Sequence, residues 1–279
     1  MIGLSCHSRN YGPGTQDETF SFIKKLGFEY IDVDGVETIK QADVLENPDK
    51  QAQIAKELSQ KYNIKLAEYF MGNMQLNGQS YSPSELEVHQ RDSLYGNFDK
   101  ICRFASQSGF SSIVGSAGLL RKDMGYERSF EYAAEVLRKM VSIAADHGVQ
   151  FHVEPSMHSL LKLPAKALEM AQQVQGLKFT LDFLHFQAKG IDQEESMQLL
   201  EYMGHMHARQ SAVGWAKCPY EFGEIDYDRI MKRLRGLKWK GIIAMEFSNG
   251  PAEEAAGMSP VEQTILMRYE LKRLIKKYF

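Results

Sequence analysis

The chain has 279 residues, of which 43% are hydrophobic and 25% are charged, the composition of an ordinary soluble globular protein. Its net charge of −3 and its estimated pI of about 6.3 lack the basic excess that is typical of duplex-binding proteins, so we expect no nucleic-acid partner. No apolar run approaches the ~18 residues of a membrane span, so we expect no membrane partner.

The cysteines and the first residues indicate a compartment. Cys6, Cys102 and Cys218 are widely spaced and form no Cys-x-x-Cys pair, which argues against a disulfide framework and fits a reducing environment. The opening residues MIGLSC enter a predicted strand at once, without the charged segment and long apolar stretch of a secretion signal. We therefore expect a cytoplasmic protein.

Short β-branched or apolar runs alternate with longer amphipathic stretches, a pattern that indicates βα units and a parallel sheet. Eight runs are candidate strands: 2–6, 30–33, 66–70, 112–115, 150–154, 179–182, 205–209 and 242–246. About 35 residues per unit is a size typical of a barrel. No Pro/Ser-rich linker divides the chain, so we predict an α/β protein, a single-domain (β/α)8 TIM barrel over residues 1–279.

The segments between these runs carry helix signals. Thr15 and Glu18 have the spacing of a capping box, and Gly109 stands where a helix end needs a left-handed residue. The polar segment 72–82 follows the third candidate strand, on the face where barrel enzymes place substrate loops. It is equally well explained as a lid or as a plain surface loop.

Each of the later candidate strands ends, or nearly ends, in a polar side chain: Glu154, Asp182, His207 and Glu246. A single acid at a strand end is usually a helix cap or a surface ion pair. Polar groups at the ends of four consecutive strands are more specific, because those ends meet at the top of a barrel. We therefore predict that these four side chains converge around the barrel axis.

Converging carboxylates repel one another strongly unless a positive charge lies between them. A divalent cation would supply that charge. Three carboxylates and one imidazole suit Mn²⁺, Mg²⁺, Co²⁺ or Zn²⁺, and the sequence does not choose among them. We predict one divalent metal ion held by Glu154, Asp182, His207 and Glu246.

Further polar residues are candidates for the pocket. His7 ends the first candidate strand and Glu68 lies in the third, so both are predicted to contact substrate. His152 and His205 lie two residues before a predicted metal ligand on the same strand, and we interpret them as structural residues inside the barrel.

The segments HVEP, LDFLH, HMHAR, FGEIDYDRI and GIIAMEF resemble the sugar phosphate isomerase/epimerase superfamily, the xylose isomerase-like TIM barrels. The resemblance covers the whole chain and is sharpest from Val149 onward. It implies that the four strand-end residues are the metal ligands and that His185 contacts substrate. Relatives of this type are usually dimers or tetramers, so the resemblance also implies a homo-oligomer.

Departures from the family narrow the function. Xylose isomerase has a lysine where this chain has Ser156 and a second-metal aspartate where it has Gln210, which argues against a two-metal hydride shift. The ketose 3-epimerases carry a substrate-binding arginine where this chain has Val213, so either Arg209 substitutes for it or the substrate differs. The apurinic endonucleases need extra histidines on the third and fourth strands, and these are missing here.

The favoured function is a metal-dependent sugar isomerase or epimerase that abstracts a proton next to a carbonyl through a metal-stabilised enediolate. Glu154 and Glu246 would remove and return the proton, while His185 and Arg209 would hydrogen-bond developing oxyanion charge. The expected partner is a small sugar or hydroxy-keto substrate.

Other readings remain open. The runner-up is a metal-dependent dehydratase or lyase on a cyclic polyol or a dehydroshikimate-like acid, because dehydration proceeds through the same enolate. Weaker alternatives are an AP-endonuclease-like DNA repair enzyme and a non-catalytic sugar-binding barrel. The missing zinc ligands argue against the first, and the two retained glutamates argue against the second.

Overall fold

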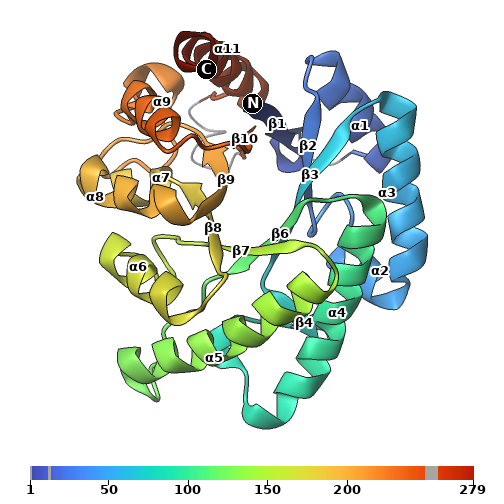
Figure 1. The fold of residues 1–279 in the computed structure, drawn as a ribbon. Helices are drawn as coiled ribbons and strands as arrows, with labels where there is room; N and C mark the ends of the chain where they lie inside the picture. Colours follow the sequence, from blue (N-terminus) through green and yellow to red (C-terminus); the bar gives the residue numbers. More distant parts are fainter. Residues whose placement is uncertain (1, 12–13, 249–256) are drawn as a thin grey trace.

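The computed structural model describes residues 2–11, 14–248 and 257–279. Eight parallel strands close into a barrel in which neighbours along the chain are neighbours in the sheet (Figure 1). They are β1 (Gly3–His7), β2 (Tyr30–Asp34), β3 (Lys65–Gly72), β6 (Ser112–Ser116), β7 (Gln150–Glu154), β8 (Lys178–Asp182), β9 (Met203–Ala208) and β10 (Ile242–Met245). The structure therefore has the predicted (β/α)8 barrel, with strand ends shifted by at most two residues from the prediction.

Helices cover the outside of the barrel (Figure 1). They are α1 (Gln16–Lys25), α2 (Gln41–Glu46), α3 (Pro48–Tyr62), α4 (Arg91–Ser108), α5 (Gly125–Asp146), α6 (Pro164–Gln173), α7 (Leu184–Gln187), α8 (Gln193–Met197), α9 (Tyr227–Gly236) and α11 (Pro260–Tyr278). Thr15 and Glu18 form the predicted capping box of α1, and Gly109 ends α4 with a φ of 94°. Within the described ranges, no helix is long and apolar enough to cross a membrane.

Strand β9 differs from its predicted span, 205–209, at both ends. It starts at Met203, which pairs with Phe179 of β8, and ends at Ala208. The backbone N–H of Arg209 donates to the hydroxyl of Tyr227 at 3.0 Å instead of to a neighbouring strand. Because Arg209 bonds to this side chain of α9 and not to a neighbouring strand, it lies just beyond the end of β9.

The segment 72–82 contains a hairpin, β4 (Met74–Leu76) paired with β5 (Gln79–Tyr81). Asn77 and Gly78 form its turn with φ values of 52° and 75°, the left-handed pair that tight hairpins favour. The Gln41 amide of α2 donates to the carbonyls of Met71 and Asn73 and accepts from the Gln75 N–H. These bonds fasten the hairpin to the barrel.

The inside of the barrel contains a polar group of side chains, here called the lumen cluster. Its members are buried and linked by hydrogen bonds: Ser5, Asp32, Glu68, Ser112, His152, Thr180 and His205. Gly204 makes room for this cluster, because a Cβ there would lie 2.3 Å from Nε2 of His152.

We expect Gly204→Ala to lower the free energy of unfolding by about 1–3 kcal/mol, the usual cost of overpacking a filled core. Gly96→Ala in α4 is the matched control, because its added Cβ meets nothing within 4 Å. That change should stabilise the protein by about 0.5–1 kcal/mol, since alanine loses less backbone entropy in a helix. Urea unfolding measures both, and equal stability of the two variants would contradict the packing argument.

Candidate metal and substrate site

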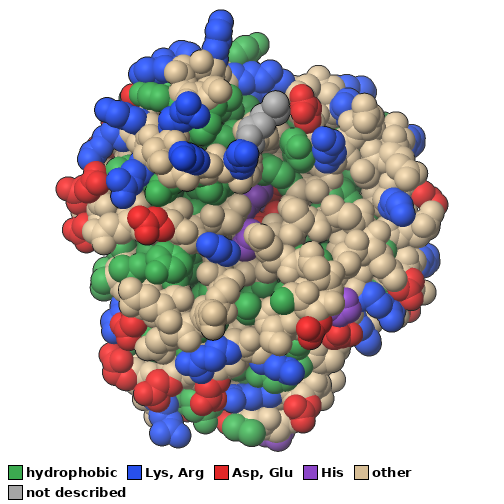
Figure 2. Space-filling view, in the orientation of Figure 1, with side chains coloured by type: hydrophobic (Ala, Val, Ile, Leu, Met, Phe, Trp, Pro, Cys, Tyr) green, Lys and Arg blue, Asp and Glu red, His purple; other side chains and the backbone are tan. Residues whose placement is uncertain are grey.

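The four residues predicted as ligands come together at the C-terminal ends of the strands. Glu154 ends β7, Asp182 ends β8, His207 lies in β9, and Glu246 directly follows β10. Together with His185 and Arg209 they form what we call the strand-end cluster. Figure 2 shows histidine and acidic side chains at the bottom of a hollow near the middle of one face of the molecule.

The imidazole of His207 organises this cluster. Its Nδ1 lies 3.1 Å from Oε1 of Glu154 and 3.1 Å from Oε2 of Glu246. One ligand atom from each of these residues lies within 4.8 Å of the others, and the same holds for Glu154, Asp182 and His185. The predicted ligands thus form two overlapping groups that share Glu154.

Arg209 bridges two of the predicted ligands. Its Nε donates to Oδ2 of Asp182 at 2.6 Å, and its Nη2 lies 3.1 Å from Oε2 of Glu246. The arginine is only 5% exposed. A fully ionised guanidinium therefore neutralises carboxylates from inside the cluster, next to the position where we predict a cation.

His185, on α7, faces the same hollow. Its Nε2 lies 3.8 Å from Oε2 of Glu154, too far for a direct hydrogen bond. Both ring nitrogens are buried and have no hydrogen-bond partner among the described residues. The ring can therefore donate to, or accept from, a small molecule at this point.

His7, at the end of β1, has a defined tautomer. Its Nδ1 accepts from the backbone N–H of Arg9 at 3.2 Å, so in the neutral ring the proton is on Nε2. That Nε2 is buried without a hydrogen-bond partner in the described structure, and the ring packs edge-on against Phe70 and His207. Burial lowers the pKa of His7, which favours the neutral ring.

Glu68 lies in the lumen cluster, one level below the strand ends. Its carboxylate accepts from Ser112 at 2.8 Å and from Thr180 at 2.9 and 3.0 Å, and it lies 2.7 Å from Nδ1 of His152. The side chain is completely buried. The predicted substrate contact of Glu68 would require these bonds to break, so its position favours a supporting role.

Sequence reasoning missed Asp32 and Arg9. Asp32 is paired with His205 at 2.7 Å, while Arg9 donates to both carboxylate oxygens of Asp34 and lies over the ring of Phe70. The signal for the acids was present in the strand itself. In the run YIDVD both acids fall on the face opposite Ile31 and Val33, and a buried acid requires a partner.

The donor atoms fit a divalent cation. Ligand atoms of Glu154, His207 and Glu246 lie within 4.8 Å of one another, and such a set of carboxylates and an imidazole suits hard or borderline divalent ions. Oε2 of Glu246 is buried and makes no hydrogen bond of proper geometry within the described residues. Its close neighbours are positively charged or protonated groups, so it retains lone pairs for a cation.

The charges of the cluster are strongly coupled. Although burial opposes ionisation, His185 and His207 hold the pKa of Glu154 below its ordinary value, and Arg209 and His207 do the same for Glu246. Conversely, and again against the effect of burial, Glu246 and Asp32 raise the pKa of His207 well above its ordinary value. The carboxylates are therefore ionised at neutral pH and the imidazole attracts a proton or a metal ion.

These pKa shifts predict how the stability of the metal-free protein, kept in a chelator, depends on pH. The lowered pKa values of Glu154 and Glu246 contribute stability that is complete above about pH 4.3, the unfolded value, and is lost as the pH falls through the folded values. The raised pKa of His207 contributes stability that is complete below about pH 6.5 and is lost as the pH rises through its folded value. Urea unfolding in a chelator should therefore show maximal stability between these limits, and an unchanged free energy below about pH 4 would contradict the assignment.

Comparison with solved structures shows what the barrel resembles. A 3-keto-D-glucoside 4-epimerase from E. coli, YcjR, superposes with a TM-score of 0.73 at 14% identity, covering 96% of this chain and 100% of its own. A D-psicose 3-epimerase from Clostridium cellulolyticum H10, solved with D-tagatose, gives 0.77 at 14%, covering 98% and 99%. The probable 3-DHS dehydratase AsbF from Bacillus anthracis gives 0.70 at 15%, covering 94% and 97%. At these identities the likeness establishes the fold.

Sequence comparison establishes the family. A search of curated protein sequences found no match. The family described as xylose isomerase-like TIM barrel, however, matches residues 20–262, which is most of the chain. This chain therefore belongs to the xylose isomerase-like TIM barrel family.

Proposed function

We propose that this protein is a metal-dependent epimerase or isomerase of a small polyhydroxy carbonyl compound, a sugar or a hydroxy-ketone. The observation that carries the proposal is the placement of two carboxylates, the part-buried Glu154 and the buried Glu246, at 3.1 Å from one imidazole nitrogen of His207. Sugar epimerases are prominent among the structural neighbours, which supports the choice of substrate class.

Four residues would hold the ion: Glu154, Asp182, His207 and Glu246. A divalent cation bound there supplies Lewis-acid polarisation of a carbonyl and an adjacent hydroxyl. Its identity among Mn²⁺, Mg²⁺, Co²⁺ and Zn²⁺ stays open, because carboxylate and imidazole donors suit all of them.

The chain itself supplies the proton transfer. Glu154 and Glu246 come from strands that are not adjacent in the barrel, so their carboxylates approach a bound substrate from different directions. Their lowered pKa values keep both ionised at neutral pH, as a base must be at the start of the reaction. One carboxylate removes the proton next to the carbonyl and, now protonated, can return it to the planar enediolate. Return on the opposite face requires that the other carboxylate first takes a proton from solvent.

The positive and polar groups around the carboxylates orient the substrate. Arg209, held by Asp182, donates to oxygen atoms on which negative charge develops, and His185 presents ring nitrogens that have no partner within the described chain. His7 adds a fixed Nε2–H donor on the side of β1.

We expect Glu246→Gln and Glu154→Gln each to lower the rate of proton exchange by about 10²- to 10⁴-fold, the usual contribution of a positioned acid–base group. The assay screens ketoses, inososes and hydroxy-keto acids with Mn²⁺ and follows deuterium uptake from solvent by NMR. Glu131→Gln, on the exposed side of α5, is the matched control and should keep full activity. Full turnover by Glu246→Gln on a confirmed substrate would overturn the two-carboxylate mechanism.

The same screen distinguishes the runner-up function, a dehydratase, from the proposed epimerase or isomerase. Deuterium incorporation without loss of water indicates epimerisation or isomerisation, whereas a conjugated product that absorbs in the ultraviolet indicates a dehydratase. Metal analysis should give one divalent ion per chain. Three zinc ions per chain would favour the endonuclease alternative instead.

Arg209→Met should lower kcat by about 10²- to 10³-fold, the loss seen when a donor to developing oxyanion charge is removed. The variant should still bind one divalent ion, because methionine removes no predicted ligand. Arg235→Met on the exposed face of α9 controls for general effects of removing a charge. Loss of the metal ion with Arg209→Met would show that the arginine supports the metal site and not the substrate.

A further inference from the structure

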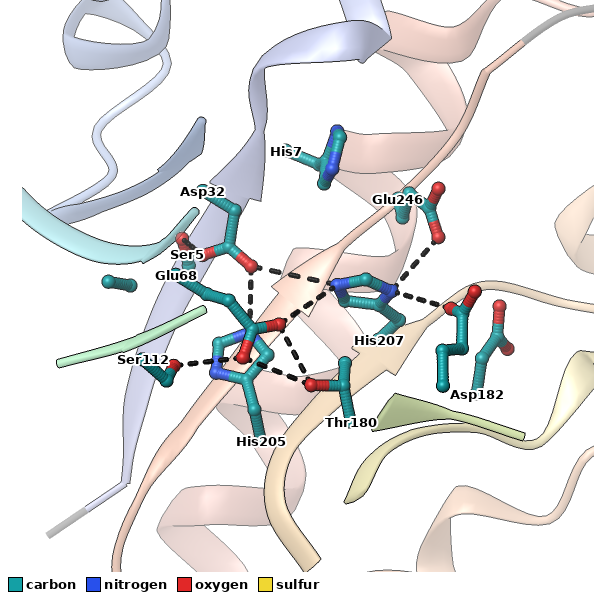
Figure 3. Close-up of polar contacts among 12 residues, drawn as sticks. Ser5, His7, Asp32, Glu68, Ser112, Thr180, Asp182, His205, His207 and Glu246 are labelled. Carbon is teal, nitrogen blue, oxygen red and sulfur yellow. Dashed lines mark hydrogen bonds and ion pairs between the residues drawn. The ribbon is translucent and has the colours of Figure 1, made fainter. Parts of the chain in front are cut away.

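The proposed function uses the strand-end cluster and leaves the lumen cluster without a role. Figure 3 shows His207 between the two, with Asp32 and Glu68 on one side and Glu246 on the other. Nε2 of His207 lies 3.7 Å from Oδ2 of Asp32 and 3.8 Å from Oε2 of Glu68. It is completely buried and has no hydrogen-bond partner among the described residues.

The protons on the Asp32 side of the lumen cluster can be assigned from the hydrogen bonds. Ser5 Oγ donates to Oδ1 of Asp32 at 2.6 Å, and His205 Nε2 lies 2.7 Å from Oδ2. An ionised carboxylate can only accept, so the proton in the second contact belongs to His205. Asp32 is thereby held in one orientation, with Oδ2 facing His207.

The Glu68 side follows the same logic. Ser112 and Thr180 donate to its carboxylate, and Nδ1 of His152 lies 2.7 Å from Oε1. Oε2 accepts from Thr180 at 2.9 Å and also faces His207. Two fixed carboxylate oxygens therefore face the same ring nitrogen from inside the barrel.

Carboxylates face both ring nitrogens of His207, so the presence or absence of a cation beside Nδ1 decides where its ring proton lies. In this structure Nδ1 lies 3.1 Å from both Glu154 and Glu246, so it carries a proton toward them. A cation bound between Nδ1 and these two carboxylates would replace that proton, and the remaining ring proton would lie on Nε2, where Asp32 and Glu68 face it. Histidines that bind metal ions generally give their other N–H to a carboxylate or carbonyl, which fixes the ring and increases its basicity. In this protein, Asp32 and Glu68 inside the barrel would accept that N–H from His207.

A second cation is the alternative occupant of the lumen cluster, because ligand atoms of Asp32, Glu68, His205 and His207 all lie within 4.8 Å of one another. The hydrogen bonds argue against it. Imidazole N–H and hydroxyl groups already donate to the carboxylate oxygens at 2.6–3.0 Å, so these oxygens are occupied.

We propose that Asp32 is a positioning residue that, together with Glu68, holds the proton of His207 on Nε2 and so presents Nδ1 to the divalent ion. This inference rests on the proposed function, since it requires that His207 binds a metal ion. It assigns a role to a carboxylate that touches neither metal nor substrate.

The test is the affinity for Mn²⁺, measured by isothermal titration calorimetry. Asp32→Asn preserves the shape of the side chain and removes its charge, and should weaken binding about 10- to 100-fold. Asp34→Asn is the matched control, because Asp34 is an equally buried carboxylate of the same strand and its ion pair is with Arg9. It should lose stability in thermal unfolding with a chelator but keep the wild-type affinity.

The possible results of the titrations separate the positioning role of Asp32 from the proposed function. Equal Mn²⁺ affinity of Asp32→Asn and wild type, or an equal loss in both variants, overturns the positioning role and leaves the proposed function intact. Two Mn²⁺ ions per wild-type chain and one per Asp32→Asn chain also overturn it, because Asp32 would then be a ligand. Absence of Mn²⁺ binding by the wild type overturns both proposals.

A measurement on the wild type keeps the inference testable if Asp32→Asn does not fold. With ¹⁵N-labelled histidine and bound Zn²⁺, NMR of the ring nitrogens should show that His207 is protonated at Nε2 and not at Nδ1. A proton on Nδ1 in the metal-loaded protein would mean that the ion binds through Nε2, which contradicts the inference.

Discussion

The imidazole of His207 lies between four carboxylates, and the rest of the site depends on this arrangement. Glu154 and Glu246 approach Nδ1, while Asp32 and Glu68 face Nε2. Each buried carboxylate costs several kcal/mol of desolvation unless a positive partner offsets it. The barrel meets this requirement with histidine protons inside and with arginine and a proposed cation at the strand ends. The contacts that balance the charges are therefore the same contacts that position the proposed catalytic groups.

Strand geometry divides these groups into two levels. Successive inward-facing residues of a strand are two apart, so His205 and His207 of β9 belong to different levels, as do Thr180 and Asp182 of β8. The lower level is sealed and its hydrogen bonds are complete, whereas the upper level faces the hollow and retains unpaired polar atoms. A rigid lower level of this kind keeps the upper level in place without using loops.

Much of the site could be predicted because strand ends in a barrel must meet. That constraint brought Glu154, Asp182, His207 and Glu246 together from the sequence alone. The sequence does not show how deep in the barrel a side chain lies or which group it pairs with. Glu68 lies below the strand ends because β3 continues to Gly72, two residues beyond its predicted end. Asp32 escaped notice because its partner, His205, is 173 residues away, and only closure of the barrel brings them together.

The guanidinium of Arg209 has a consequence for how the protein is made. The Arg209 guanidinium lies against Asp182 and Glu246, so the newly synthesised chain carries its own positive charge into the acidic centre. The barrel can therefore close before any ion arrives from the cell's metal pool, unlike small zinc domains whose folding waits for their ion. A divalent ion at the proposed site would then share these carboxylates with the resident arginine. The supply of metal would thus control the activity of the protein and not its abundance.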